Sequence, residues 1–447
     1  MKRLFRLLAL SSVFTMVLCS CGKKDEEVLP ESDDTTEQVA IDGVEVEDYN
    51  VLSYSELEVL AYEGDTDAQV MLGYMLEYGT EDVKQDFTEA ISWYQMASDS
   101  GNCDGTCALG YFYLTGTGVD QDLDKAQELF DTAIEGGSVN ANVGKARVIL
   151  AGMTDEELAE ACIPAVDTTD DEDSDETADV AEASKSAEDS DTQIQSDESV
   201  KESKEQDTSD DEDTDEATDE LTEKVQTVYD LFYKAQISGD LDGTYYLGYA
   251  YEHGIGTTGD YNKAFDYYSR AAKSESTDLA DQYAINLSNT AIGLLYINGL
   301  GVEEDVELAV EYFTTASDNG YAKASYYLGQ IYEKGIDVDR DYEQAMEYYL
   351  KAADADYAPA LNQLGYMYYN GFGVDVDFAS AVYYQKLAAL QGYAIAQVNL
   401  GFLYENGYGV ERNLETALSY YEMAAESGYE GAMEAVVRVK AQINEEM

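Results

Sequence analysis

Apolar positions along the chain follow a helical spacing that glycines interrupt at intervals. In residues 360–392 the apolar side chains first recur at i, i+4 and i+7, which is typical of one face of a helix. Gly371 and Gly373 then end this pattern, because glycine adopts positive φ without strain. Asp377 is placed to cap a second apolar helix, which ends at Gly392. The pattern predicts a hairpin of two short α-helices.

The same hairpin pattern recurs with a fixed period. Gly293, Gly329, Gly365 and Gly401 lie 36 residues apart in succession. Such a period is typical of a solenoid of stacked units. Helices of about 12–15 residues are marginal alone in water, so stacking must supply the stability. The sequence therefore predicts an all-α solenoid of αα-hairpins, a fold class that usually binds other macromolecules and rarely catalyses reactions.

This repeat resembles that of the Sel-one-like repeat (SLR) family, a branch of the tetratricopeptide-like superfamily. The family pattern is A-x-x-x-L-G-x-x-Y-x-x-G-x-G-V-x-x-D-x-x-x-A-x-x-Y-Y-x-x-A-A-x-x-G. Repeats that fit it begin at Ala68, Gly105, Gly243, Ser288, Ala324, Ala360 and Ala396. The resemblance covers roughly residues 54–444, apart from one acidic insertion, and implies a right-handed αα-hairpin solenoid. One branch of the family has a disulfide in every repeat, and this chain lacks that pattern.

The N-terminal sequence predicts a signal peptide over residues 1–20, followed by a flexible tether over residues 21–52. Basic residues come first, and the apolar run of residues 7–18 is too short to span a membrane as a stable helix. The run LCSCG at residues 18–22 resembles a bacterial lipobox, which implies cleavage before Cys21 and lipidation of its thiol. We expect a lipid-anchored protein on the extracytoplasmic face of the cell membrane. The alternative is an ordinary secretory signal with incidental cysteines.

Acidic residues dominate the composition and restrict the partners. The chain has 93 Asp and Glu against 25 Lys and Arg, which gives a formal net charge of −68. Nucleic acid and anionic lipid would be repelled, because binding them requires a basic footprint. We therefore expect protein partners, basic ones in particular, or a polysaccharide, with membrane contact through the lipid anchor only. The alternative is that the acidity serves only solubility and reach.

An acidic segment interrupts the repeats. Residues 167–223 contain 26 Asp and Glu, three Lys and no aromatic residue, so they cannot bury enough apolar surface to fold. We expect a disordered insertion over residues 153–220, between solenoids at residues 53–152 and 221–447, with a short helix over residues 154–162 before the disorder begins. The stretches on either side align with the first and second helix of one repeat, which predicts one continuous solenoid. Two separate solenoids on a flexible tether are the alternative.

Candidate partner-binding residues lie on the first helix of each hairpin. In the related tetratricopeptide fold this helix lines the concave surface, so the resemblance implies that the residue after the LG glycine points into it. With neighbours one turn away, the candidates are Tyr245, Tyr249, Glu252, Tyr326, Glu333, Tyr366, Tyr369, Asn370, Phe402, Glu405 and Asn406. Tyrosine is a frequent hot spot of protein interfaces, and its ring also stacks on sugars. The alternative is packing between repeats, which we expect of Tyr332, Tyr348 and Tyr420 at the family's core positions.

Groups with catalytic or metal-binding chemistry are scarce. His253 is the only histidine, at a predicted helix end, and the chain has no phosphate-binding GxxxxGK[ST] loop. We expect no enzyme activity, no cofactor and no metal. Cys103, Cys107 and Cys162 are an odd number of cysteines in an exported chain, so at least one lacks an internal partner. The pairing of Cys103 with Cys107 stays open.

Two functions are consistent with the sequence. The first is a surface-anchored protein–protein interaction scaffold of the bacterial envelope, which binds partners through the concave face of the solenoid. The second is a carbohydrate-binding or hydrolytic surface protein that uses an aromatic groove. Specific sugar binding on a glycan array, lost on Tyr366→Ala, would favour the second.

Overall fold

The computed structural model describes residue 49 and residues 52–79, 83–162, 213–276 and 279–446. The predicted lipidation site at Cys21, the tether and the centre of the acidic segment lie outside these residues. The described residues form helices and no β-strand, which confirms the all-α fold class. The chain divides into two compact units, with the boundary between Ala284 and Ile285.

The first unit contains the described residues up to Cys162 together with those of 213–284. Its helices are α2 (Tyr54–Tyr62), α3 (Thr66–Tyr78), α4 (Phe87–Asp99), α5 (Cys103–Thr115), α6 (Leu123–Glu135), α7 (Ala141–Ala151), α8 (Asp155–Ala161), α10 (Asp213–Ile237), α11 (Leu241–His253) and α12 (Tyr261–Ala272). The pairs α3–α4, α5–α6, α7–α10 and α11–α12 pack as helical hairpins.

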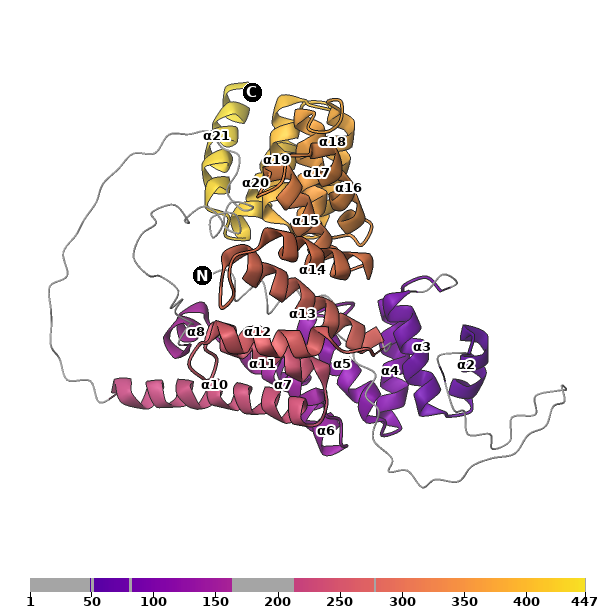
Figure 1. The fold of residues 1–447 in the computed structure, drawn as a ribbon. Coiled ribbons are helices and arrows are strands. Elements are labelled where there is room, and N and C mark those ends of the chain that lie inside the picture. The colour runs from indigo at the N-terminus through magenta and orange to yellow at the C-terminus, as the bar shows by residue number, and fades with distance from the viewer. Residues whose placement is uncertain (1–48, 50–51, 80–82, 163–212, 277–278, 447) are drawn as a thin grey trace, which may run out of the picture. The chain divides into compact units, whose positions relative to one another are not determined.

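The second unit contains residues 285–446 among those described. Helix α13 (Leu279–Asn298) begins in the first unit and ends in the second. It is followed by α14 (Val306–Asp318), α15 (Ala322–Lys334), α16 (Tyr342–Ala353), α17 (Ala358–Asn370), α18 (Phe378–Leu390), α19 (Ala394–Asn406), α20 (Leu414–Glu426) and α21 (Glu430–Glu446). The pairs α15–α16, α17–α18 and α19–α20 pack as hairpins, drawn from orange to yellow in Figure 1, and α21 packs on α20.

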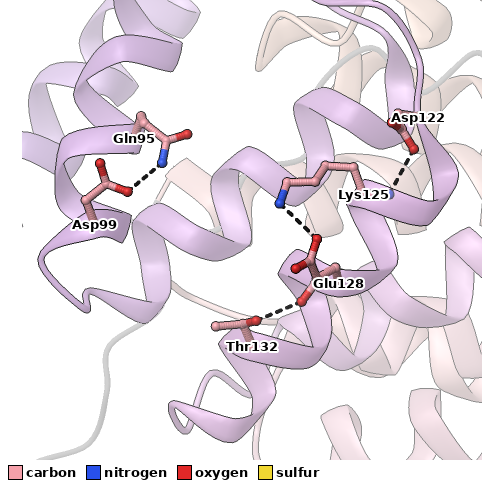
Figure 2. Close-up of polar contacts among 6 residues, drawn as sticks. All are labelled: Gln95, Asp99, Asp122, Lys125, Glu128 and Thr132. Atoms are coloured by element: carbon pink, nitrogen blue, oxygen red, sulfur yellow. Dashed lines mark hydrogen bonds and ion pairs between the residues drawn. The ribbon is translucent and has the colours of Figure 1, made fainter.

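The second helix of a hairpin begins at a side chain that caps its N-terminus. In α6, the Asp122 carboxylate accepts a hydrogen bond from the backbone N–H of Lys125 at 2.9 Å, as Figure 2 shows. Farther along this helix, the Lys125 ammonium lies 2.9 Å from Glu128, and the Thr132 hydroxyl donates to the Glu128 backbone oxygen at 2.8 Å. The cap satisfies a backbone N–H that has no partner within the helix.

The loop inside a hairpin carries two glycines in the left-handed conformation. Gly371 has a φ of 75° and Gly373 a φ of 69°, in agreement with the sequence prediction. A Cβ on Gly373 would lie 2.6 Å from the backbone oxygen of Tyr342 in the preceding hairpin, so this loop rests on the first turn of α16. Asp377 then accepts from the backbone N–H of Ala379 at 2.9 Å, which confirms the predicted cap of α18.

The glycine of each LG pair lies under a large side chain of the second helix. A Cβ on Gly329 would lie 2.5 Å from the ring of Tyr349, and one on Gly401 would lie 2.9 Å from the ring of Tyr421. Only glycine lets the two helices approach this closely. The preceding leucine is fully buried, since Leu364 has an exposed fraction of 0 %. The period of LG pairs in the sequence is therefore the period of the hairpin cores.

Helices α7 and α10 form a hairpin although the acidic segment separates them in sequence. Val143 and Ala146 of α7 share one hydrophobic cluster with Val225, Val228 and Phe232 of α10. Helix α10 also packs against α11, the first helix of the next hairpin. The chain therefore leaves for the acidic segment and returns from it within a single hairpin of the first unit.

Two predicted boundaries differ from the structure. Helix α8 lies where the sequence predicts a short helix before the disorder, and the start of α10 at Asp213 lies inside the predicted insertion over residues 153–220. Acidic residues are favourable in the first turn of a helix, because their charge offsets the helix dipole there. The predicted ranges 53–152 and 221–447 also differ from the two compact units, because α7 and α10 belong to the same unit.

Candidate interaction surface

The side chains that follow the LG glycine, with the corresponding residue of α7, form a series that we call the first-helix row. In the first unit the row consists of Tyr74, Tyr111, Arg147 and Tyr249, and all four are buried. In the second unit it consists of Leu294, Gln330, Tyr366 and Phe402. The first three of these are half-buried, and Phe402 is 40 % exposed. The first-helix row is thus buried in the first unit, whereas in the second unit its last residue, Phe402, is exposed to solvent.

The predicted partner-binding residues differ widely in exposure. Tyr245, Tyr249, Tyr326 and Glu405 are buried, whereas Glu252, Glu333, Tyr366, Tyr369 and Asn370 are half-buried and Phe402 and Asn406 are exposed. The ring of Tyr245 lies 5.3 Å from that of Tyr268, and the ring of Tyr326 lies 5.7 Å from that of Tyr349. Tyr245 therefore packs inside its own hairpin, whereas Tyr326 also packs on Tyr357, the N-cap residue of α17, with 5.5 Å between ring centroids. Partner binding by any of these residues stays a prediction.

The predicted glutamates accept hydrogen bonds from tyrosines of their own hairpins. Each of these tyrosines is the ring that covers the LG glycine. The bonds are Tyr268 to Glu252 at 2.6 Å, Tyr349 to Glu333 at 2.5 Å, Tyr421 to Glu405 at 2.9 Å and, in the first hairpin, Tyr94 to Glu77 at 2.8 Å. Burial, reinforced by the negative carboxylate, raises the pKa of each of these tyrosines.

Where the covering ring is a phenylalanine, the glutamate position holds an apolar residue. It is Leu114 in the hairpin of Phe130 and Ile297 in the hairpin of Phe313. A buried carboxylate requires a hydrogen-bond donor, and phenylalanine has none. In these hairpins a glutamate therefore occurs where the second helix supplies a tyrosine hydroxyl as its hydrogen-bond donor. This pairing gives the glutamate a structural role in its hairpin.

Three of these glutamates differ in their second partner. The Gln363 amide donates to both oxygens of Glu333 at 3.0 Å. The Arg438 guanidinium forms an ion pair with Glu405 at 2.9 Å. In contrast, the other oxygen of Glu77 is buried and has no hydrogen-bond partner among the described residues. Burial raises the pKa of Glu77 to about 8, although the hydrogen bond from Tyr94 acts in the opposite direction.

Rings gather around Tyr366 in the second unit. Phe372, in the loop after α17, stacks on Tyr342 with 4.8 Å between ring centroids and 8° between ring planes. The rings of Phe372 and Tyr366 meet edge to face, with 5.8 Å between centroids. Tyr366, Phe372 and Tyr342 are all half-buried. Tyr366 lies on α17, Phe372 lies in the loop after it, and Tyr342 lies at the start of α16, the second helix of the preceding hairpin.

An equivalent set lies one repeat later. Tyr408, in the loop after α19, lies 5.1 Å from Phe378 and 5.9 Å from Phe402. Tyr369 joins this set, with its ring 5.5 Å from Phe378 and 5.9 Å from Phe402. We call the two sets together with Tyr369 the aromatic strip. Its members are Tyr342, Tyr366, Tyr369, Phe372, Phe378, Phe402 and Tyr408.

The sequence prediction included only three members of the strip, Tyr366, Tyr369 and Phe402. The other four lie in loops or at the start of second helices, outside the first helix on which the prediction was based. A signal was present in the sequence, because the aromatic positions 342, 366 and 372 recur 36 residues later. Asn370 and Asn406 lie beside the strip and donate their side-chain amides to the backbone oxygens of Tyr366 and Phe402 at 2.9 Å.

The buried part of the row surrounds Arg147. Its guanidinium lies 5.3 Å from the ring centroid of Tyr111 and 5.9 Å from that of Tyr246. Burial raises the pKa of Asp242, on α11, well above its usual range, and the charge of Arg147 acts in the opposite direction. Neither carboxylate oxygen of Asp242 has a hydrogen-bond partner among the described residues. These polar groups are enclosed by the first unit, so they do not form an open surface.

Residues with reactive chemistry are dispersed. His253 ends α11, as predicted, and its ring stacks on Tyr249 with 4.1 Å between centroids. Cys107 and Cys162 have free, buried thiols, so Cys107 does not pair with Cys103. No group of three or more His, Cys, Asp or Glu in the described ranges could hold a metal ion. None of the described helices has the length and apolar character needed to cross a membrane.

Comparison with known families identifies the hairpins. The Sel1 repeat matches residues 66–102, 104–138, 241–276, 287–321, 322–357, 358–393 and 394–429, which is more than half of the chain. The chain belongs to the Sel1 repeat family. Each matched Sel1 repeat corresponds to one hairpin, and the α7–α10 hairpin lies between the matched ranges. Sel1 repeat proteins generally mediate protein–protein interactions, and their scaffold is typically non-catalytic.

Individual relatives include a plant protein and two bacterial structures. The ERAD-associated E3 ubiquitin-protein ligase component HRD3B of Arabidopsis thaliana is 26 % identical over 257 residues, which cover 57 % of this chain and 36 % of that protein. The match thus spans about a third of that relative's length. A Sel1 repeat protein from Oxalobacter formigenes is 21 % identical, with a TM-score of 0.45 and coverage of 86 % of this chain and 90 % of the other. The protective antigen c5321 of uropathogenic Escherichia coli, which displays an SLR fold, is 21 % identical, with a TM-score of 0.31 and coverage of 88 % and 91 %.

Proposed function

We propose that this Sel1 repeat protein is a surface-anchored scaffold of the bacterial envelope that binds protein partners through the first-helix row of its second unit. Membership of the Sel1 repeat family supports protein binding. The lipobox-like run at residues 18–22 supports attachment through a lipid on Cys21. The observation that carries the proposal is the exposure of the row at its end, where Phe402 is 40 % exposed beside the half-buried Tyr369.

The exposed rings favour a protein partner for a physical reason. Tyrosine and phenylalanine are enriched in the cores of protein interfaces, where they bury a large area at a small cost in side-chain entropy. The net charge of −68 favours partners of opposite charge, because complementary charge accelerates encounter. The buried Arg147 cluster of the first unit offers no comparable surface.

Replacement of Cys21 tests the anchor. In cells, Cys21→Ala should leave the uncleaved precursor and remove the mature protein from the membrane fraction. Cys19→Ala is the matched control, because it removes a neighbouring thiol and keeps the predicted lipidation site. Unchanged processing and membrane association of Cys21→Ala would exclude the anchor.

Site-specific crosslinking tests the binding surface. A photoreactive amino acid at position 402 should form discrete adducts with a protein in intact cells. The control is the same group at position 383, which is also exposed in the second unit but lies on a second helix. Equal adducts at both positions, or none at 402, would contradict binding through this row.

A carbohydrate ligand is the second candidate, because the half-buried rings of the strip could stack on sugars. The side-chain amides of Asn370 and Asn406 lie next to these rings. A glycan array would support this candidate if specific binding occurred and were lost on Tyr366→Ala.

A further inference from the structure

We propose that the aromatic strip binds the arginine or lysine side chains of an extended, basic segment in a protein partner. The proposal rests on the scaffold function and names the chemistry that the second unit would recognise. The strip presents two equivalent ring sets one repeat apart, so an extended segment could contact both.

The rings of the strip are not a requirement of the fold. In the preceding repeat, the equivalent positions hold Val306, Gln330 and Ile336, and the same helices form there. Ile336 and Gln330 are half-buried, as are the rings that replace them one repeat later. The solenoid therefore accepts aliphatic and amide side chains at these positions. Two aromatic sets in succession are a property of this part of the chain, where Tyr342 and Phe372 pack against one hydrophobic cluster and Tyr369 and Tyr408 against the next while staying only half-buried.

The chain itself contains a cation on one of these rings. The guanidinium of Arg340 lies 5.8 Å from the ring centroid of Tyr342, at an exposed position. Such contacts are electrostatic, because the face of an aromatic ring is negative. The same guanidinium donates hydrogen bonds to the Tyr342 hydroxyl and to the backbone oxygen of Lys334, both at 3.4 Å, so a cation of the chain itself already lies beside the first ring set.

Carboxylates border both sets. Asp339 and Asp341 flank the start of α16, and Asp375 and Asp377 flank the start of α18, and all four are exposed. Hydrogen bonds from the side chain and backbone of Ser380 lower the pKa of Asp377, so it is charged at neutral pH. Asp341 and Asp377 directly precede the rings of Tyr342 and Phe378 in sequence, so both sets lie next to negative charge.

The neighbouring basic residue of the second set is already paired. Arg412 forms an ion pair with Glu446 at 2.8 Å and donates to the backbone oxygen of Glu405 at 3.0 Å. The strip is thus bordered by carboxylates in a chain with 93 acidic and 25 basic residues. A neutral peptide or a sugar would use the rings and leave this charge without a counterpart, so a cationic segment fits better.

The test uses a fluorescent peptide of four Arg-Gly-Gly units and the same peptide with citrulline in place of arginine. Citrulline keeps the shape of the side chain and removes its charge. Binding to the full-length protein is measured by fluorescence anisotropy at two salt concentrations, because general attraction to an acidic protein weakens steeply with salt. We expect the arginine peptide to bind about tenfold more tightly than the citrulline peptide at the higher salt concentration.

The variants copy residues that the fold already carries. Tyr366→Gln and Phe372→Ile reproduce the preceding repeat at Gln330 and Ile336, and circular dichroism verifies that each variant folds. The double variant should lose about tenfold in affinity for the arginine peptide. The matched control is Tyr383→Gln, which removes a tyrosine 59 % exposed on α18 and should stay within about twofold of the wild type.

The outcomes separate this proposal from the scaffold function. Equal affinity for the arginine and citrulline peptides would refute recognition of cations, even if crosslinking at position 402 still captures a protein. Wild-type affinity in the double variant would mean that only general charge attracts the peptide, which also refutes the proposal. Selective peptide binding without any crosslink at position 402 would instead contradict the scaffold function and leave the cation site standing.

Discussion

The first and the last hairpin of the matched repeats contain the same hydrogen bond in different surroundings. In α3–α4, Tyr94 donates to Glu77, and in α19–α20, Tyr421 donates to Glu405. Glu405 also forms an ion pair with Arg438 of the adjoining α21. Glu77 has no such cation among the residues that the structure describes, and burial raises its pKa to about 8.

The hydrogen bond to each glutamate and the compensation of its charge have different structural origins. The hydrogen bond belongs to the repeat, because both partners lie in one hairpin. The negative charge of Glu405, in contrast, is compensated from outside the hairpin, because Arg438 lies on the next helix, α21. In the first hairpin, the position that corresponds to Arg438 holds Tyr111, which supplies no charge. Burial of Glu77 therefore makes the stability of the first hairpin depend on pH.

The largest expected effect is a pH dependence of the first hairpin. Because the pKa of Glu77 is raised from 4.5 to about 8, its contribution to stability is complete below about pH 4.5 and is lost as pH rises to about 8. The loss in unfolding free energy should be on the order of 4 kcal/mol. Glu77→Gln should remove this dependence, and hydrogen exchange of α3 and α4 at several pH values measures it. A Glu77→Gln variant with the same pH dependence as the wild type would show that another group is responsible.

The next effect comes from removal of the tyrosine hydroxyl of the first hairpin. Tyr94→Phe leaves the buried Glu77 without its hydrogen-bond donor, which should cost about 2 kcal/mol in denaturant unfolding. The double variant Tyr94→Phe, Glu77→Leu copies the hairpin of Phe130 and Leu114 and should recover most of this loss. If the double variant were as unstable as the two single variants combined, the link between hydroxyl and carboxylate would be wrong.

A smaller effect should follow when the last hairpin is made like the first. Arg438→Met removes the cation from Glu405, whose side chain is only 9 % exposed, whereas that of Arg438 is 52 % exposed. Because solvent screens the exposed partner, we expect a loss of about 1.5 kcal/mol in unfolding free energy at pH 7. Lys440→Met is the matched control, since its pair with Glu422 is solvent-exposed. Equal losses in the two variants would mean that burial of Glu405 is unimportant.

The smallest effect is expected for the tyrosine of the last hairpin. Tyr421→Phe removes one donor from Glu405, but Arg438 remains bound to it. The loss should be about 1 kcal/mol, below that of Tyr94→Phe. Denaturant unfolding of both variants at one pH makes the comparison. A larger loss for Tyr421→Phe would reverse the order that the ion pair predicts.

Much of the hairpin could be predicted because its determinants are close in sequence. Gly371, Asp377 and Leu364 act on their own helix ends or on the facing helix of the same hairpin. The exposure of the tyrosines could not be predicted in this way. Tyr326 and Tyr366 occupy neighbouring positions of the same first-helix face, yet Tyr326 is buried and Tyr366 is half-buried. Their surroundings come from different repeats, so the pattern within one repeat does not distinguish them.

The sequence by itself determined the helical hairpin, its period and its caps, because glycine, leucine and capping residues act through local geometry and through the facing helix. Only the tertiary structure decided that α7 and α10 share a core on either side of the acidic segment, where the sequence also allowed a tether between separate solenoids. It also decided that Phe372 and Tyr342 meet across two hairpins, and that Glu405 has a cation while Glu77 has none within the described part of the chain. These properties arise between helices that are far apart in sequence, and the charge and burial of a side chain depend on such neighbours.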